Sequence, residues 1–196
     1  MRTSHRAALA AAVAFAGLSA AIVPTNSAAD TRSAFADQAV RAGLTAAQTA
    51  GLQQRVAAYL DATGGHRIAL NKIAVKGGTI LVTVPGETYA RELNGVLDRS
   101  APASALAAFW ADCPYLYFCG WKGANRTGDQ WNISKCGVQQ EIPDGWNSGG
   151  SWQNNQSSGT RARMYGKSRN LVYTTPPAPY GPVNGDWAPV WYVQAC

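Results

Sequence analysis

The stretch from Cys113 to Cys196 constrains the fold of this chain more than any other part of its sequence. It contains all four cysteines, six of the seven tryptophans, six of the eight tyrosines and no histidine. Only four residues of the stretch are acidic, namely Asp129, Glu141, Asp144 and Asp186. Large aromatic side chains pack and bind, but such a composition offers few groups that transfer protons. It therefore favours a binding or inhibitory module over an enzyme, and we expect no catalytic residues.

The first 29 residues have the pattern of an export signal. An apolar run over residues 7–23 follows a basic start made by Arg2, His5 and Arg6. Ser27 and Ala29 then supply the small residues that signal peptidase requires. The run is shorter than the ~20 apolar residues that span a bilayer, so a membrane anchor is disfavoured. We predict cleavage near Ala29 and a secreted, extracellular product without membrane contact.

The predicted export makes disulfides possible, because they form in oxidising compartments. Cys113, Cys119, Cys136 and Cys196 are an even set and predict two disulfides. Zinc is disfavoured because no two of them form a CxxC pair. Four cysteines allow three pairings, and the sequence leaves all three open. A bond from Cys196 would tie the end of the chain back to the rest of the stretch.

The charge of the chain is modest and locally concentrated. The net charge of +6 becomes +4 after loss of Arg2 and Arg6, because 15 basic and 11 acidic residues remain. The one local basic cluster comprises Arg161, Arg163, Lys167 and Arg169. A nucleic-acid surface would need more positive charge, so we expect no nucleic-acid partner. The cluster is either a solvated face or an attractor for an acidic partner.

Residues 30–100 predict a small α+β segment. Thr45 and Gln48 form a capping box, and apolar residues at helical spacing run from there to Gly64 and Gly65. Alternating apolar residues at 68–75 and 80–84, separated by a turn at 76–78, predict a β-hairpin. One helix on two strands is a thin core, so this segment needs a packing partner. Two alternatives stay open: a removable pro-region or a permanent accessory domain.

Residues 101–112 are predicted to be a linker. Residues 113–196 are predicted to form a small all-β sandwich. Short strands are separated there by glycine, asparagine and proline turns. The predicted strands cover residues 115–121, 130–133, 160–165, 171–174 and 190–193. The proline-rich run at 175–189 predicts an exposed, semi-rigid loop. His66, the histidine that remains after cleavage, has no partner in its motif and is expected to be a surface residue.

Several local patterns together resemble one family. Residues 113–121 resemble its opening strand, and Trp121 to Gly128 resembles a βγ-crystallin turn, in which glycine follows an aromatic residue by seven positions. Cys136-Gly137, residues 142–147 and residues 151–155 continue the pattern in order. In these features the chain is similar to the secreted actinobacterial peptidase inhibitors typified by the Streptomyces metalloproteinase inhibitor.

The resemblance implies a βγ-crystallin-like Greek-key sandwich that inhibits secreted metalloendopeptidases of the thermolysin type. Three features of the chain depart from the pattern. Arg126 stands where the family often has a second aromatic residue, so the corner at Trp121 should use cation–π packing. Val172 replaces the glycine of the second turn. The family's calcium pattern would place ligands at Asn147 and Ser151, but this run has no carboxylate, and we expect no cofactor beyond this weak calcium candidate.

Two functions are therefore weighed, and a crystallin-like structural protein without a specific partner is the third alternative. In the first, a monomeric inhibitor presents a rigid, disulfide-stiffened loop to a secreted protease. In the second, a cell-wall or carbohydrate-binding module stacks aromatic rings on sugars. For both, the candidate contact surfaces are the loops at 147–158 and 175–189. The candidate partner-binding residues in and beside these loops are Trp146, Asn147, Trp152, Tyr180 and Trp187.

Overall fold

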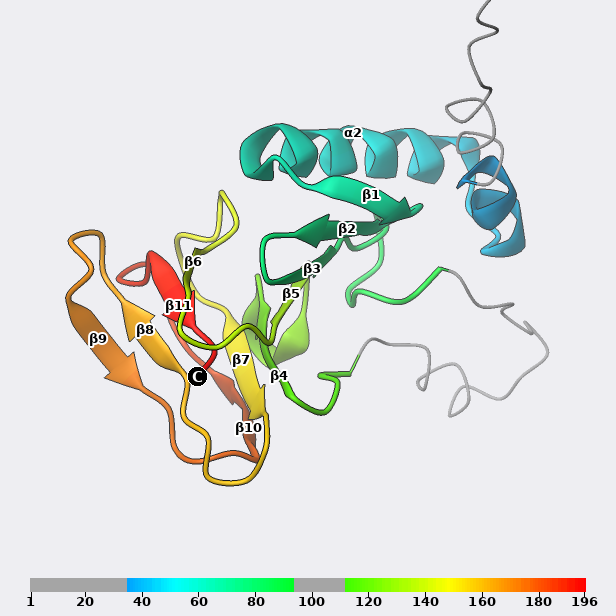
Figure 1. Ribbon diagram of the computed structural model, residues 1–196. Helices are drawn as coiled ribbons and strands as arrows, with labels where there is room; N and C mark the ends of the chain where they lie inside the picture. Colours follow the sequence, from blue (N-terminus) through cyan, green and yellow to red (C-terminus); the bar gives the residue numbers. More distant parts are fainter. Residues whose placement is uncertain (1–34, 94–111) are drawn as a thin grey trace, which may run out of the picture.

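The computed structural model describes residues 35–93 and 112–196, which form two antiparallel sheets beside a long helix (Figure 1). The fold is mainly β, as predicted. The predicted signal peptide and most of the predicted linker lie outside the described residues. A short helix at 35–41 precedes α2 (Ala46–Thr63). The strands are β1 (His66–Ala69), β2 (Lys72–Val75), β3 (Gly78–Leu81), β4 (Tyr117–Trp121), β5 (Gln130–Ile133), β6 (Gln139–Glu141), β7 (Ser151–Asn155), β8 (Arg163–Tyr165), β9 (Leu171–Thr174), β10 (Tyr180–Asn184) and β11 (Tyr192–Gln194).

Helix α2 begins and ends where the sequence predicts. The Gln48 N–H donates to Thr45 Oγ1 at 3.1 Å, and the Thr45 N–H donates to Gln48 Oε1 at 3.0 Å, which completes the capping box. Gly64 ends the helix in the left-handed conformation, with φ 62°. Three residues at helical spacing, Leu52, Val56 and Tyr59, are buried on one face of the helix. Capping therefore fixes the length of α2, and this apolar face fixes its orientation.

The predicted hairpin that follows is in fact a three-stranded meander. Residues 68–75 do not form one strand, because β1 and β2 are separated by a turn at Leu70 and Asn71. The apolar residues Leu70 and Ile73 are three positions apart, which breaks the alternation of a single strand. The buried Asn71 side chain donates to the Val82 and Arg91 carbonyls, both at 2.9 Å. These side-chain bonds add to the backbone hydrogen bond that the Asn71 carbonyl accepts from the Val82 N–H at 2.8 Å.

The predicted α+β segment and the predicted β sandwich share one sheet. β3 pairs with β5, with Ile80 opposite Trp131, so that one sheet runs in the order β1-β2-β3-β5-β4-β7-β10. A Cβ on Gly78 would lie 1.9 Å from the Asn132 carbonyl oxygen, so glycine permits this close approach. The second sheet has the order β6-β11-β8-β9. The α+β segment obtains the packing partner that its thin core requires from β5.

A buried carboxylate joins the two segments. Asp129 is 1% exposed and accepts hydrogen bonds from Arg55 at 2.6 Å, from the Tyr59 hydroxyl at 2.7 Å and from the Thr83 N–H at 2.8 Å. The Trp146 indole N–H donates to the Tyr59 hydroxyl at 3.1 Å. Burial, and then the Asp129 charge, raises the pKa of Tyr59 above its ordinary value. This network connects α2 to β5 and to the loop after β6.

The sequence predicts the positions of β4, β5, β8, β9 and β11 but misses three strands. β7 lies within the loop predicted at 147–158, and β6 lies between the strands predicted at 130–133 and 160–165. β10 lies inside the proline-rich run that is predicted to be an exposed loop. β7 is an interior strand of the larger sheet, between β4 and β10. Its buried Asn154 side chain donates to Thr160 O at 2.9 Å and to Thr175 Oγ1 at 3.1 Å. Side-chain hydrogen bonds of this kind stabilise β7 without the apolar alternation that identifies strands in a sequence.

Both predicted disulfides are present. Cys113 is bonded to Cys119, and Cys136 is bonded to Cys196 across a sequence separation of 60. The second bond lies beside a backbone hydrogen bond from the Gly137 N–H to the Cys196 carbonyl at 3.0 Å. It ties the end of the chain to the β5–β6 connection, as predicted for Cys196.

Candidate functional site

The five predicted partner-binding residues divide into buried and exposed groups. Trp146, Trp152 and Trp187 are all at most 5% exposed, so these rings are core residues rather than contact residues, which corrects the prediction. The three tryptophans are buried because an indole between two sheets removes more apolar surface from water than any other side chain. Tyr180 and Asn147 are exposed and remain available to a partner.

Tyr180 lies in an aromatic groove between β9 and β10. The groove encloses about 450 Å³ between the free edges of the two sheets. We define it by Trp152, Tyr173, Tyr180 and Asp186, with Val172 and Val183 among its apolar walls. The ring of Trp152 lies 5.9 Å from that of Tyr180 and 5.8 Å from that of Tyr173. Both tyrosines are 42% exposed, so the buried Trp152 supports two accessible rings.

The polar groups at this groove are few. Two hydrogen bonds hold the Asn184 side chain: its Oδ1 accepts from the Asn125 backbone N–H at 2.7 Å, and its Nδ2 donates to Asn125 Oδ1 at 3.0 Å. The Asp186 carboxylate accepts from the Ala188 N–H at 3.0 Å and is exposed. An accessible surface of two phenol rings and one carboxylate binds flat apolar faces and hydroxyl donors.

Ser151, one of the two residues of the weak calcium candidate, uses its hydroxyl in other hydrogen bonds. Ser151 is 1% exposed, and its hydroxyl donates to the Gly123 carbonyl at 2.8 Å and accepts from the Arg126 N–H at 2.8 Å. It therefore stabilises the turn before β5. Among residues 35–93 and 112–196, no three His, Cys, Asp or Glu side chains gather where they could hold a metal ion. The geometry gives no support to calcium at Asn147 and Ser151.

The segment from Cys113 to Cys119, which we call the disulfide loop, is a contact surface that sequence reasoning missed. The pattern predicts an extended strand from residue 115, but a turn occupies residues 115 and 116 and β4 starts at Tyr117. At this turn Tyr115 is 67% exposed and Leu116 is 50% exposed. The available signal was the pair of apolar side chains between two closely spaced cysteines that are predicted to be oxidised.

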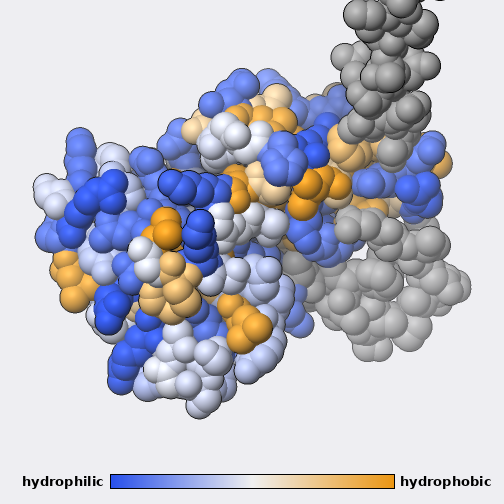
Figure 2. Space-filling view, in the orientation of Figure 1, coloured by the Kyte–Doolittle hydropathy of each residue, from blue (hydrophilic) through white to orange (hydrophobic). Residues whose placement is uncertain are grey.

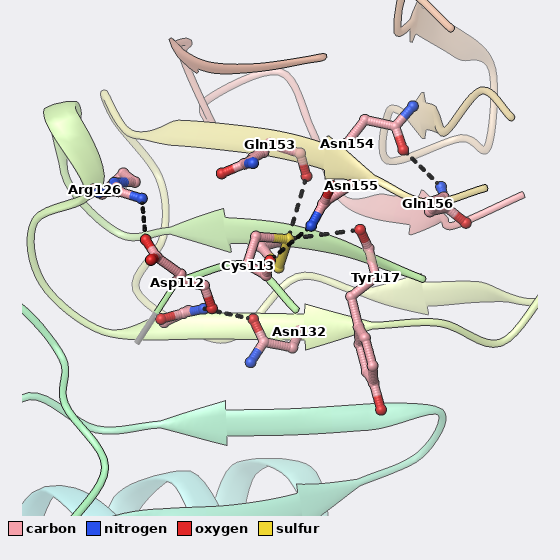
Figure 3. The surroundings of a disulfide bond; sticks show 11 residues. Asp112, Cys113, Tyr117, Arg126, Asn132, Gln153, Asn154, Asn155 and Gln156 are labelled. Carbon is pink, nitrogen blue, oxygen red and sulfur yellow. Dashed lines mark hydrogen bonds and ion pairs between the residues drawn. A yellow bond between two sulfur atoms is a disulfide. The ribbon is translucent and has the colours of Figure 1, made fainter. Parts of the chain in front are cut away.

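The disulfide loop is held from several sides. Leu116 donates its N–H to Asn155 O at 2.8 Å, and the Asn155 side chain donates to Cys113 O at 2.8 Å. Figure 3 shows Asn155, Gln153 and Tyr117 gathered around the Cys113 side chain. The Tyr117 N–H also donates to Pro114 O at 3.2 Å. Leu116 itself has φ 75°, a left-handed conformation that is uncommon outside glycine. The backbone of this loop is therefore fixed while its two apolar side chains stay in solvent.

Behind the loop lies the predicted cation–π corner. The Arg126 guanidinium is 5.8 Å from the Trp121 ring centroid, as the substitution at this position predicts. Arg126 also pairs with Asp112 at 2.6 Å, so it holds the residue that leads into the loop. Trp121, Cys113 and Cys119 form a small buried cluster on this side of the sheet. The loop thus rests on a packed base.

Comparison of the chain with protein-family models, curated proteins and solved structures gives no match. Among the described residues, no helix is long and apolar enough to cross a membrane.

Proposed function

We propose that this chain is a secreted protein inhibitor of extracellular peptidases and that the disulfide loop is the segment that enters the protease cleft. The observation that carries the proposal is the pair of exposed side chains, Tyr115 and Leu116, on a backbone fixed by a disulfide and by hydrogen bonds to Asn155. A rigid loop loses little conformational entropy on binding, so its contacts translate into affinity.

The proposal includes the finer features that the family resemblance implies. The target is a metalloendopeptidase of the thermolysin type, and residues 113–196 are a βγ-crystallin-like Greek-key sandwich. Two features support this description: Gly128 has φ 79° at the end of the predicted turn, and Arg126 packs on Trp121. The inhibitor acts as a monomer, by shape, without a cofactor or catalysis of its own. The export pattern and the two disulfides support secretion.

Inhibition assays with the full secreted protein test the proposal. We expect inhibition of a thermolysin-like enzyme and an inhibition constant at least about tenfold higher for the Tyr115→Ala, Leu116→Ala double variant, since buried anchor residues dominate interfaces. Tyr180→Ala, which removes an exposed tyrosine outside the loop, is the matched control and should inhibit normally. Absence of inhibition across metallo-, serine and cysteine endopeptidases would refute the proposal. Full potency of the double variant would refute the role of the loop.

The aromatic groove favours a second candidate function, carbohydrate binding. Exposed Tyr173 and Tyr180 present ring faces, and Asp186 can accept from sugar hydroxyls. Pull-down on peptidoglycan, chitin and cellulose tests this function. Tyr180→Ala should release a bound protein, whereas the Tyr115→Ala, Leu116→Ala variant should bind like the parent. Failure to bind all three polymers excludes this candidate for those polymers and leaves the inhibitor proposal untouched.

A further inference from the structure

Strand β9 is a free edge that is unusually apolar. In the described part of the chain it pairs with β8 alone, at the end of the four-stranded sheet. Leu171, Val172 and Tyr173 are 56%, 40% and 42% exposed. In an antiparallel pair, alternate residues direct their N–H and C=O groups away from the partner strand, so an edge strand offers hydrogen bonds to another chain. β10, one of the two end strands of the larger sheet, contains Pro182, which has no N–H to offer.

Positive charge predominates in the segment that contains β9, although the exposed Asp186 carboxylate lies at the aromatic groove that Val172 and Tyr173 line. Residues 157–180 include four basic residues and no acidic one. These are Arg161, Arg163, Lys167 and Arg169, and all four are exposed. No ion pair among residues 35–93 and 112–196 involves them. Such a surface attracts a negatively charged partner.

Two of these cations lie against aromatic rings. The Lys167 ammonium lies 4.9 Å from the Trp191 ring centroid, and the Arg169 guanidinium lies 4.2 Å from that of Tyr192. Contact with the rings orients both side chains but leaves their charge unneutralised. Figure 2 shows a hydrophobic patch bordered by hydrophilic residues at the left edge of the molecule, where Figure 1 places the β8–β9 hairpin.

We propose that the β9 edge binds an extended, acidic peptide segment of a partner protein by adding it to the sheet as a further strand. The free backbone groups of β9 would pair with the peptide backbone, and the basic cluster would face its carboxylates. Val172 and Tyr173 also line the aromatic groove, so alternate apolar side chains of the added strand would reach that groove.

The same observations argue against other occupants. A second copy of this chain would bring two sets of four basic residues together, and like charges oppose such pairing. An anionic polysaccharide would use the charges but not the unpaired backbone groups. This surface lies in a different sheet from the disulfide loop, so the proposal goes beyond inhibition and does not depend on it.

The probe is a fluorescent octapeptide of alternating glutamate and valine, blocked at both ends, whose binding to the full secreted protein is followed by anisotropy and by backbone amide NMR shifts. We expect saturable, salt-sensitive binding with the largest shifts at Val172 and its neighbours in β9. The lysine–valine peptide should bind at least about tenfold more weakly, because its charge is reversed. A glutamate–valine peptide of alternating D and L residues should also bind weakly, because it cannot form a regular strand with β9.

Two charge-reversal variants test whether the basic cluster contributes to peptide binding. Arg163→Glu has no side-chain bond to lose among the described residues and should weaken binding of the glutamate–valine peptide several-fold. The matched control is Lys135→Glu, an exposed cation elsewhere in the sequence, which should bind like the parent. Equal binding of the D,L peptide would overturn strand addition, as would shifts centred on β1 or β10. Concentration-dependent dimerisation through β9, or absence of peptide binding at millimolar concentration, would also overturn the proposal.

Discussion

The Trp187 side chain shows how a single residue determines the course of the backbone around it. Its indole N–H donates to Trp121 O at 2.8 Å, and its ring packs against the backbone at Gly150 and Gly120. Gly150 has φ 124°, and a Cβ there would lie 2.0 Å from Trp187 Nε1. The site therefore excludes any side chain for two reasons, conformation and contact.

Gly150→Ala should lower the free energy of unfolding by about 3 kcal/mol or more, because backbone strain and overlap with the indole add. The matched control is Gly149→Ala. Gly149 has φ 51° and open space around its Cβ position, so strain alone should cost about 1 kcal/mol. Urea denaturation of both variants checks the difference. Equal losses would contradict the packing described for Trp187.

Tyr59→Phe removes one oxygen from the buried junction. The variant leaves Asp129 without one of its donors and the Trp146 indole without its acceptor. We expect the free energy of unfolding to fall by about 2 kcal/mol, the usual cost of unsatisfied buried polar groups. Tyr115→Phe, at an exposed tyrosine, should change it by less than about 0.5 kcal/mol. Denaturant titration of the two variants gives the comparison.

The raised pKa of Tyr59 also predicts an alkaline limit to stability. Folding favours the neutral phenol, so this contribution is fully present below the unfolded pKa of about 10 and is lost as the pH rises from there toward the folded pKa. Between about pH 10 and 11 the free energy of unfolding should fall by up to about 1.4 kcal/mol through this group. Tyr59→Phe should show a shallower decline over the same interval. Parallel slopes in parent and variant would argue against the assignment.

At the level of elements, the two disulfides should differ in their effect on stability. The bond between Cys136 and Cys196 spans 60 positions and that between Cys113 and Cys119 spans 6. Chain entropy predicts a loss of about 4 kcal/mol when the first pair is changed to serine and about 2 kcal/mol for the second. Thermal denaturation of the two double variants measures both. The smaller loop should matter more for protease inhibition, and the reverse order in both assays would contradict the roles assigned here.

The elements that the sequence predicts are those whose signals are local. The capping box at Thr45 and the glycine at 64 locate α2, and an aromatic run locates β4. β7 and β10 escape prediction because their stabilising partners are distant: Asn154 depends on Thr160 and Thr175, and β10 depends on β7 itself. The burial of an aromatic ring likewise depends on partners that are distant in the sequence. Composition indicates that tryptophans pack or bind, but only the meeting of two sheets decides that Trp146, Trp152 and Trp187 pack.

At the scale of the whole molecule, the α+β segment is structurally part of the sandwich. It supplies the strand that pairs with β5 and covers core residues such as Trp131. A chain that starts at residue 112 would leave β5 as an unpaired edge and would leave Asp129 buried without Arg55 and Tyr59.

We therefore expect the chain from residue 112 to be unfolded or aggregated, as judged by circular dichroism and sedimentation, and to lack inhibitory activity. The full secreted protein, handled in parallel, is the control. A folded and inhibitory chain from residue 112 would instead favour the removable pro-region. Mass spectrometry of the secreted protein gives an independent answer, since a permanent segment predicts a mature N-terminus near residue 30.

The pairing of β3 with β5 also affects how fast the chain is expected to fold. Gly78 meets Ile133 and Leu81 meets Gln130, so the middle of the larger sheet closes only after a long intervening stretch of chain has been brought into place. The strands β7 and β10 meet across another such separation. Folding dominated by distant contacts takes milliseconds to seconds, whereas folding from local contacts takes microseconds. We therefore expect this chain to complete its larger sheet late in folding and to stay unfolded in the meantime, which is the state in which the secreted product that we propose would cross a membrane.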